Sequence, residues 1–115
     1  MELQHETLEN GLLHIKLIGR LDVLGAQEID IKFTALTASK KTNVLVDLGQ
    51  VSFLASLGIR TLITSAKALD NRGGLMVLLN PQPNVFNVLD TSGVTSLIPT
   101  YFDFAEACAA LQIRS

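Results

Sequence analysis

The sequence predicts an α/β domain over residues 1–115, with a mixed β-sheet of four to five strands and about four helices mainly on one face. Apolar patterns of strand period alternate with patterns of helical period after an initial pair of strands, which is typical of α/β proteins. The helical patterns are apolar on one side only, so the helices should cover one face of the sheet. A length of 115 residues is enough for one hydrophobic core and too short for two.

The chain opens with two segments that predict an antiparallel hairpin. Residues 12–18 alternate between apolar and polar side chains, as in a half-buried strand. Residues 3–8 precede this segment across a turn at 9–11, where an Asn-Gly pair favours a tight reversal. We therefore expect these two strands to pair.

A first helix and a central strand are expected next. Asp22 stands where a helix cap should, before apolar residues that recur at helical spacing, namely Ala26, Ile29, Phe33 and Leu36. Residues 43–48, NVLVDL, are almost wholly apolar, which indicates a strand that is covered on both faces. We place this strand at the centre of the sheet.

The second half of the chain continues the alternation. A second helix is predicted by apolar residues at helical spacing and is closed by the turn 71–74; these residues are Ile59, Leu62, Ile63, Ala66 and Leu69. A buried strand is expected at 75–79. The remaining elements are a short helix at 85–89, a weak strand at 94–101 and a final helix at 102–113 with Asp103 near its start.

Composition excludes several classes of function. A net charge of -2 provides no basic surface for a nucleic acid, so none is expected as a direct partner. Every apolar run is shorter than the roughly 20 residues that a membrane helix needs. The N-terminus lacks the basic and apolar regions of a signal peptide, so a cytoplasmic protein is expected.

The motifs of common enzymes and metal sites are missing, so we expect no catalytic residue, metal or cofactor. His5 and His14 lie in the predicted hairpin, where solvated side chains are expected. Cys108 lies among alanines and is expected to pack as a small apolar group. Glu28 and Asp30 fit a solvated helix face.

Ser56 is the position with the most specific placement, because it follows the central strand and a loop and immediately precedes the second helix. One interpretation makes Ser56 the N-cap of that helix, with its hydroxyl oxygen accepting a hydrogen bond from a free amide. Another starts from the same geometry, since free amides and the positive end of the helix dipole also favour a phosphate on this hydroxyl.

Four segments together resemble STAS domains of the anti-sigma factor antagonist type. LVDLGQVSFLASLGIRTLITSAKAL is similar to the central motif of that family, in which a buried strand leads through an aromatic residue to a Ser or Thr. GRLDVLGAQEI resembles the segment before the first helix, NRGGLMVLLN the Gly-Gly strand, and NVFNVLDTSGVTSLIP the penultimate helix and last strand. The resemblance covers essentially all 115 residues.

The resemblance implies protein binding by partner switching, without catalysis. In the family, the antagonist binds an anti-sigma factor that is usually a serine kinase with an ATP site, and phosphorylation by that kinase releases the antagonist. The implied partners are such an anti-sigma factor and a phosphatase. The phosphoacceptor of the family falls on Ser56, the acidic residue of the neighbouring loop on Asp22, and the following glycine on Gly58.

Three positions depart from the pattern of the family. Ala55 and Leu57 stand where polar residues flank the phosphoacceptor, and Arg20 stands where Glu is frequent. An apolar loop suits constitutive binding as well as a switch. A second hypothesis is therefore an unmodified STAS subunit of a larger lipid-transport or stress-sensing assembly.

The leading hypothesis is an anti-sigma factor antagonist whose binding surface joins Asp22, the 53–58 loop and the exposed side of the second helix. Its expected partner-binding residues are Asp22, Phe53, Leu54, Ala55, Leu57, Gly58, Arg60, Thr61 and Ser65.

Overall fold

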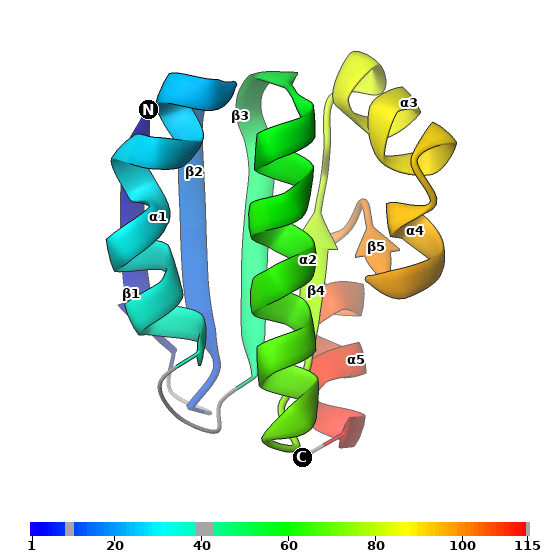
Figure 1. The fold of residues 1–115 in the computed structure, drawn as a ribbon. Helices are drawn as coiled ribbons and strands as arrows, with labels where there is room; N and C mark the ends of the chain where they lie inside the picture. Colours follow the sequence, from blue (N-terminus) through cyan, green and yellow to red (C-terminus); the bar gives the residue numbers. More distant parts are fainter. Residues whose placement is uncertain (9–10, 39–42, 115) are drawn as a thin grey trace.

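The computed structural model describes residues 1–8, 11–38 and 43–114, which form one five-stranded sheet and five helices (Figure 1). The strands lie in the order β1-β2-β3-β4-β5; their bounds are β1 Glu2–Thr7, β2 Leu13–Leu21, β3 Val44–Leu54, β4 Met76–Leu79 and β5 Thr100–Tyr101. The helices are α1 Val23–Ala38, α2 Ser56–Asn71, α3 Pro83–Thr91, α4 Val94–Leu97 and α5 Phe104–Arg114. β1 pairs antiparallel with β2 and all other pairs are parallel, which confirms the predicted mixed sheet.

Both faces of the sheet are covered at its centre. Val44 and Val46 of β3 point into the larger core, which also holds buried side chains of α1, α2 and α3. Leu45 points the other way, into a smaller cluster with Ala107 and Leu111 of α5. The helices therefore lie mainly on one face, as predicted, while α5 lies behind the sheet (Figure 1). This two-sided burial explains why the segment around β3 is apolar throughout.

The predicted helix patterns point inward as expected. In α1, Ala26, Ile29 and Phe33 are at most 3% exposed. In α2, the backbone ends in a turn at which the Gly74 amide donates to the Leu69 carbonyl oxygen at 2.8 Å. Gly73 in this turn has φ +82, a left-handed conformation that favours glycine.

Predicted boundaries are wrong in two regions of the chain. β2 and β3 are longer than expected and stay paired until Leu21 lies opposite Leu54, across two irregularities in register. The expected loop before residue 55 is therefore strand. In the other region, Val94–Leu97 forms the short helix α4, and only Thr100–Tyr101 is strand. Helical spacing explains the helix, because Val94 and Ile98 are four residues apart and both are buried.

Residues 9–10 of the predicted turn, which include the Asn10 of its Asn-Gly pair, lie outside the described residues. On either side of them, the Leu8 amide donates to the Leu12 carbonyl oxygen at 2.8 Å, which closes the hairpin. Within the described ranges, no helix has the length and apolar character needed to cross a membrane.

Candidate functional site

The sequence-predicted site lies where β2 and β3 end side by side and two helices begin. Asp22 alone separates β2 from α1, and Ala55 alone separates β3 from α2. The Ala55 amide donates to the Leu21 carbonyl oxygen at 3.0 Å, which holds the two strand ends together. Figure 1 shows that α1 and α2 start at the same end of the sheet. We call residues 20–25 and 53–58 the strand-end surface.

Two glycines allow the close packing of this end. A Cβ atom on Gly58 would lie 2.6 Å from Leu21 Cγ, 2.8 Å from the Leu21 carbonyl oxygen and 3.0 Å from Leu54 Cδ1. A Cβ atom on Gly25 would lie 2.0 Å from the Arg20 carbonyl oxygen. Both glycines are buried, so each helix can begin in contact with the end of β2.

Ser56 is the first residue of α2, and its side chain is exposed. Ala55 is the N-cap residue, with φ -107 and ψ 171, and α2 has no side-chain cap hydrogen bond. The interpretation of Ser56 as N-cap is therefore wrong. The reason is the extra length of β3, which leaves only one residue before the helix, and that residue is Ala55. The Ser56 hydroxyl stands free at the positive end of a 16-residue helix.

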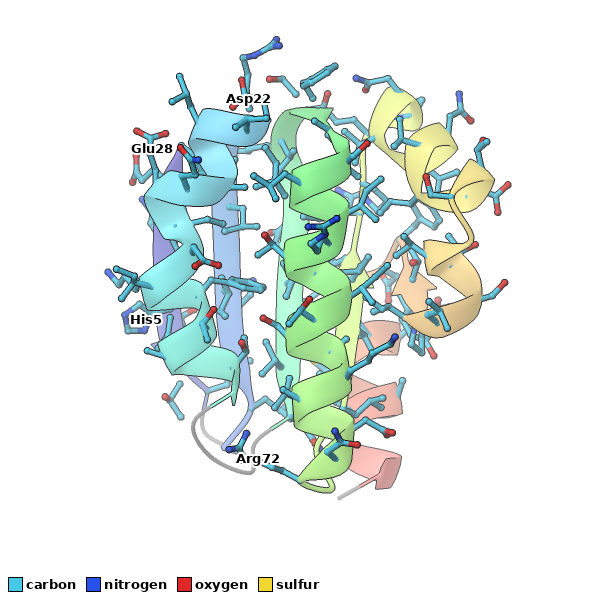
Figure 2. The ribbon with its side chains drawn as sticks, in the orientation of Figure 1. His5, Asp22, Glu28 and Arg72 are labelled. Atoms are coloured by element: carbon cyan, nitrogen blue, oxygen red, sulfur yellow. The ribbon has the colours of Figure 1, made fainter. Side chains whose placement is uncertain are left out.

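Asp22 combines a structural and an electrostatic role at the same end (Figure 2). Its Oδ1 atom accepts a hydrogen bond from the Gly25 amide at 2.8 Å, which confirms the predicted cap of α1. Its Oδ2 atom lies 3.3 Å from Nε of Arg20. The pKa of the Asp22 carboxyl is lowered, first by the Gly25 amide and further by Arg20, against an opposing effect of desolvation.

Arg20 also contacts the aromatic residue of the predicted site. The Arg20 guanidinium carbon lies 4.5 Å from the centre of the Phe53 ring, a cation–π contact. The Phe53 side chain is nevertheless 39% exposed. Arg20, Asp22 and Phe53 therefore present a cation, an anion and an aromatic ring in one small area of the strand-end surface, to which Ser56 also belongs.

The remaining predicted contact residues divide by burial. Arg60 is exposed, and Ala55, Leu57 and Thr61 are half-buried. The Thr61 hydroxyl donates to the Leu57 carbonyl oxygen at 3.1 Å. These four residues remain available at the surface.

Three predicted contact residues are not available. Leu54 is 4% exposed, Gly58 is buried and Ser65 is 3% exposed. Ser65 lies three residues after Leu62 and four before Leu69, so it faces the core with these two leucines. The prediction of Ser65 as an exposed residue is therefore wrong. Leu54 and Gly58 belong to the packed layer under the strand-end surface.

Three large apolar side chains of α1 are exposed among its polar ones, which the sequence interpretation missed. Val23, Leu24 and Ile31 are 53%, 70% and 84% exposed. Beside them, a groove of about 420 Å³ runs between α1 and α2; it is lined by Ala26, Gln27, Asp30, Ile31, Leu57 and Thr61. The sequence contains the information needed to predict this exposure. Val23, Leu24 and Ile31 do not share the helical spacing of the residues that face the core, so they must lie on another side of α1.

The other polar residues that the sequence interpretation considered lie on the hairpin and on α1. The predictions for His5, Glu28 and Asp30 as exposed residues are confirmed. The side chain of His14 is only 18% exposed, with its ring centre 5.6 Å from that of Phe104, so its prediction as a solvated residue is wrong. Phe104 at the start of α5 lies against the imidazole, and the carboxylates of Glu6 and Asp47 lie within 4 Å of its nitrogen atoms. Among the residues that the structure describes, no group of His, Cys, Asp and Glu is placed to hold a metal ion.

Comparison with known proteins identifies relatives over nearly the whole chain. The family model of the STAS domain matches residues 5–107. BtrV of Bordetella bronchiseptica is 28% identical over 103 residues, which cover 90% of this chain and 89% of BtrV. The anti-sigma F factor antagonist of Lysinibacillus sphaericus is 29% identical over 115 residues, which cover 99% of this chain and 96% of the relative. These matches confirm the resemblance predicted from the sequence.

Solved structures share the fold. The anti-sigma factor antagonist SpoIIAA in its unphosphorylated form has a TM-score of 0.79 at 23% identity, covering 96% of both chains. Bacillus SpoIIAA in the phosphorylated form has a TM-score of 0.70 at 25% identity, covering 95% of this chain and 98% of that one. The murine anion transporter Slc26a9 has a TM-score of 0.76 at 19% identity, where the match covers 90% of this chain and 18% of the transporter.

Proposed function

The chain belongs to the STAS domain family, and we propose that it is a cytoplasmic anti-sigma factor antagonist that works by partner switching. Its partner would be an anti-sigma factor with serine kinase activity, and a phosphatase would restore the unmodified form. Ser56 would be the phosphoacceptor. The observation that carries this proposal concerns Ser56, which is exposed and is the first residue of α2. Its hydroxyl does not cap the helix, because the N-cap residue is Ala55.

The surface around Ser56 is suited to a protein partner. Phe53 and three apolar residues of α1, namely Val23, Leu24 and Ile31, are exposed. The groove between α1 and α2 extends this area to Leu57 and Thr61. Exposed apolar patches with polar rims mark protein interaction sites. Asp22, Ala55 and Arg60 would complete the contact area, while buried Leu54 and Gly58 would hold it in place.

Phosphorylation would change the charge of this surface more than its shape. A phosphate on Ser56 adds about -1.5 to -2 charges near pH 7. The N-terminus of α2 favours a negative charge, so the modified protein would stay folded. The partner, however, would have to bury this phosphate beside the ionised Asp22 and against apolar contacts, and that desolvation would lower its affinity.

Substitutions at Ser56 test the switch against a matched position on the same helix. We expect Ser56→Asp to weaken binding to the anti-sigma factor, and Ser56→Ala to bind as the parent does and to resist phosphorylation. Thr64 is exposed on α2, away from the strand-end surface, so Thr64→Asp and Thr64→Ala serve as controls. Pull-down from cells with intact-mass analysis of the recovered chain reports partner and phosphate together. If Ser56→Asp binds as tightly as Thr64→Asp, the switch is refuted.

A second candidate function is that of an unmodified subunit in a larger assembly, such as a lipid-transport or stress-sensing complex. The apolar neighbours Ala55 and Leu57 favour it, and the fold of this chain is found within the larger Slc26a9. Recovery of an ABC-type ATPase in place of a soluble kinase would support this candidate. In both cases the chain would bind without catalysis, and turnover that depends on Asp22 or Ser56 would contradict both.

A further inference from the structure

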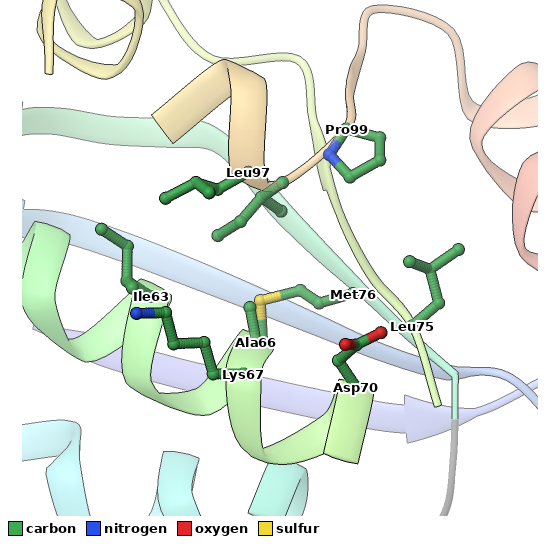
Figure 3. A pocket seen from close by; sticks show the side chains of 9 residues that line it. Ile63, Ala66, Lys67, Asp70, Leu75, Met76, Leu97 and Pro99 are labelled. Carbon is green, nitrogen blue, oxygen red and sulfur yellow. The ribbon is translucent and has the colours of Figure 1, made fainter. Parts of the chain in front are cut away.

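A pocket lies far from the strand-end surface, between the C-terminal half of α2 and the α4–β5 connection (Figure 3). Its volume is about 300 Å³. The floor is formed by Met76 and Ile98, which are 2% and 1% exposed and belong to the main core. Its walls include Ile63 and Ala66 of α2 and Leu97 of α4. The pocket therefore reaches from solvent down to core side chains.

The volume limits the size of a ligand. Small-molecule sites usually have volumes of about 300–1,000 Å³, so this pocket is at the lower end. If each non-hydrogen atom takes about the 30 Å³ that a water molecule takes in the liquid, the pocket holds roughly ten such atoms. One wall is adjustable, because Leu97 is 61% exposed and belongs to a helix of four residues.

The charged groups of the pocket are both on α2. Figure 3 shows the Lys67 ammonium on the Ile63 side and the Asp70 carboxylate on the Leu75 side. Among the described residues, no carboxylate lies within 4.0 Å of the Lys67 ammonium. Lys67 is thus a cation on one side of the pocket, and the carboxylate of Asp70, which also lines the pocket, lies on the opposite side and forms no ion pair with it.

We propose that this pocket binds a small amphipathic anion, with a chain of about eight carbons on Met76 and Ile98 and a carboxylate on Lys67. Apolar walls favour the chain through burial of its surface. The free ammonium favours an anion over an alcohol or an amine, whereas the carboxylate of Asp70 disfavours an anion at the opposite side. The proposal is independent of the proposed function, since neither Ser56 nor Asp22 lines this pocket.

The test is a methyl-detected NMR titration of the full chain with sodium octanoate, octan-1-ol and octylammonium. We expect octanoate to shift the Met76, Ile63 and Leu97 methyl signals with saturation. Because ion pairs with exposed lysines contribute little, octanoate should bind only about two- to fivefold more tightly than octanol. Lys67→Gln should remove this preference and leave the affinity for octanol unchanged.

Lys32→Gln is the matched control, because Lys32 is an exposed lysine on α1 outside the pocket and should keep the preference for octanoate. Two results would overturn the proposal. Octylammonium could bind as tightly as octanoate to the parent chain. Alternatively, octanoate could shift Leu24 and Ile31 on α1 as strongly as Met76, which would mean unspecific adsorption to exposed apolar side chains.

Discussion

Gly58→Ala tests whether α2 begins in contact with the end of β2. The added methyl group would lie 2.6 Å from Leu21 Cγ and 2.8 Å from the Leu21 carbonyl oxygen. The leucine side chain could turn away, but the carbonyl oxygen accepts the hydrogen bond from the Ala55 amide and has little freedom to move. The substitution should therefore push the start of α2 away from the sheet.

The size of the effect follows from two opposing contributions. Forcing an extra carbon into a packed site costs about 1–3 kcal/mol. Replacing glycine by alanine inside a helix gains up to about 1 kcal/mol. The expected net loss in the free energy of unfolding is about 1–2 kcal/mol, and for a domain of this size it lowers the melting temperature by roughly 4–8 °C.

Urea unfolding followed by circular dichroism measures this loss. Thr64→Ala on the exposed side of α2 is the control. It should raise the free energy of unfolding by no more than a few tenths of a kcal/mol, because alanine favours the helix slightly more than threonine does. If Gly58→Ala is as stable as Thr64→Ala, α2 does not begin in close contact with Leu21, and Gly58 is not needed for the packing of the strand-end surface.

Three further predictions concern burial and charge. Phe33→Ala empties a fully buried site and should lower the free energy of unfolding by about 3–5 kcal/mol in a urea titration, whereas Phe102→Ala, at a 57% exposed residue, should cost far less. Because folding lowers the pKa of Asp22, its ionised carboxylate stabilises the fold at every pH above the pKa that this group has in the unfolded chain. The difference in the free energy of unfolding between the parent and Asp22→Asn should therefore shrink as the pH falls below about 4. Burial raises the pKa of the Cys108 thiol, so iodoacetamide at pH 8 should alkylate it more slowly in the folded chain than in urea.

Local patterns in the sequence were sufficient for most of the fold. The spacing of Ala26, Ile29 and Phe33 predicts which side of α1 is buried, and Asp22 predicts where that helix begins. The apolar run of β3 places it at the centre of the sheet, because only a strand covered on both faces needs apolar residues on both. Each of these features depends on neighbours within one or two turns of the chain.

The errors concern features that depend on distant partners. Residues 49–54 contain Gly49, Gln50 and Ser52 and look like a loop, yet they are strand because β2 lies alongside them. That extension decides the identity of the N-cap and leaves Ser56 free. His14 is half-buried because Phe104 of α5, 90 residues further along the chain, lies against it together with Asp47 of β3. No pattern near position 14 carries that information.

The strand-end surface has an asymmetry that bears on its function. Asp22 and Ala55 hold equivalent positions, since each is the single residue between a parallel strand and the helix that follows. The carboxylate of Asp22 satisfies an amide at the start of α1, whereas the methyl group of Ala55 satisfies none at the start of α2. The first amides of α2 thus keep their capacity to bind an anion.

Under the proposed function, Ala55 would leave the first amides of α2 available to a phosphate on Ser56. A polar residue at position 55 would cap α2 and compete for the amides that a phosphate on Ser56 would use. We therefore expect Ala55→Asp to stabilise the unmodified chain, because carboxylates cap helices well, while it places a second fixed negative charge near Asp22. The same substitution should weaken binding of the anti-sigma factor without any phosphorylation. Unaltered binding by a stabilised Ala55→Asp chain would show that charge at the start of α2 does not control the partner.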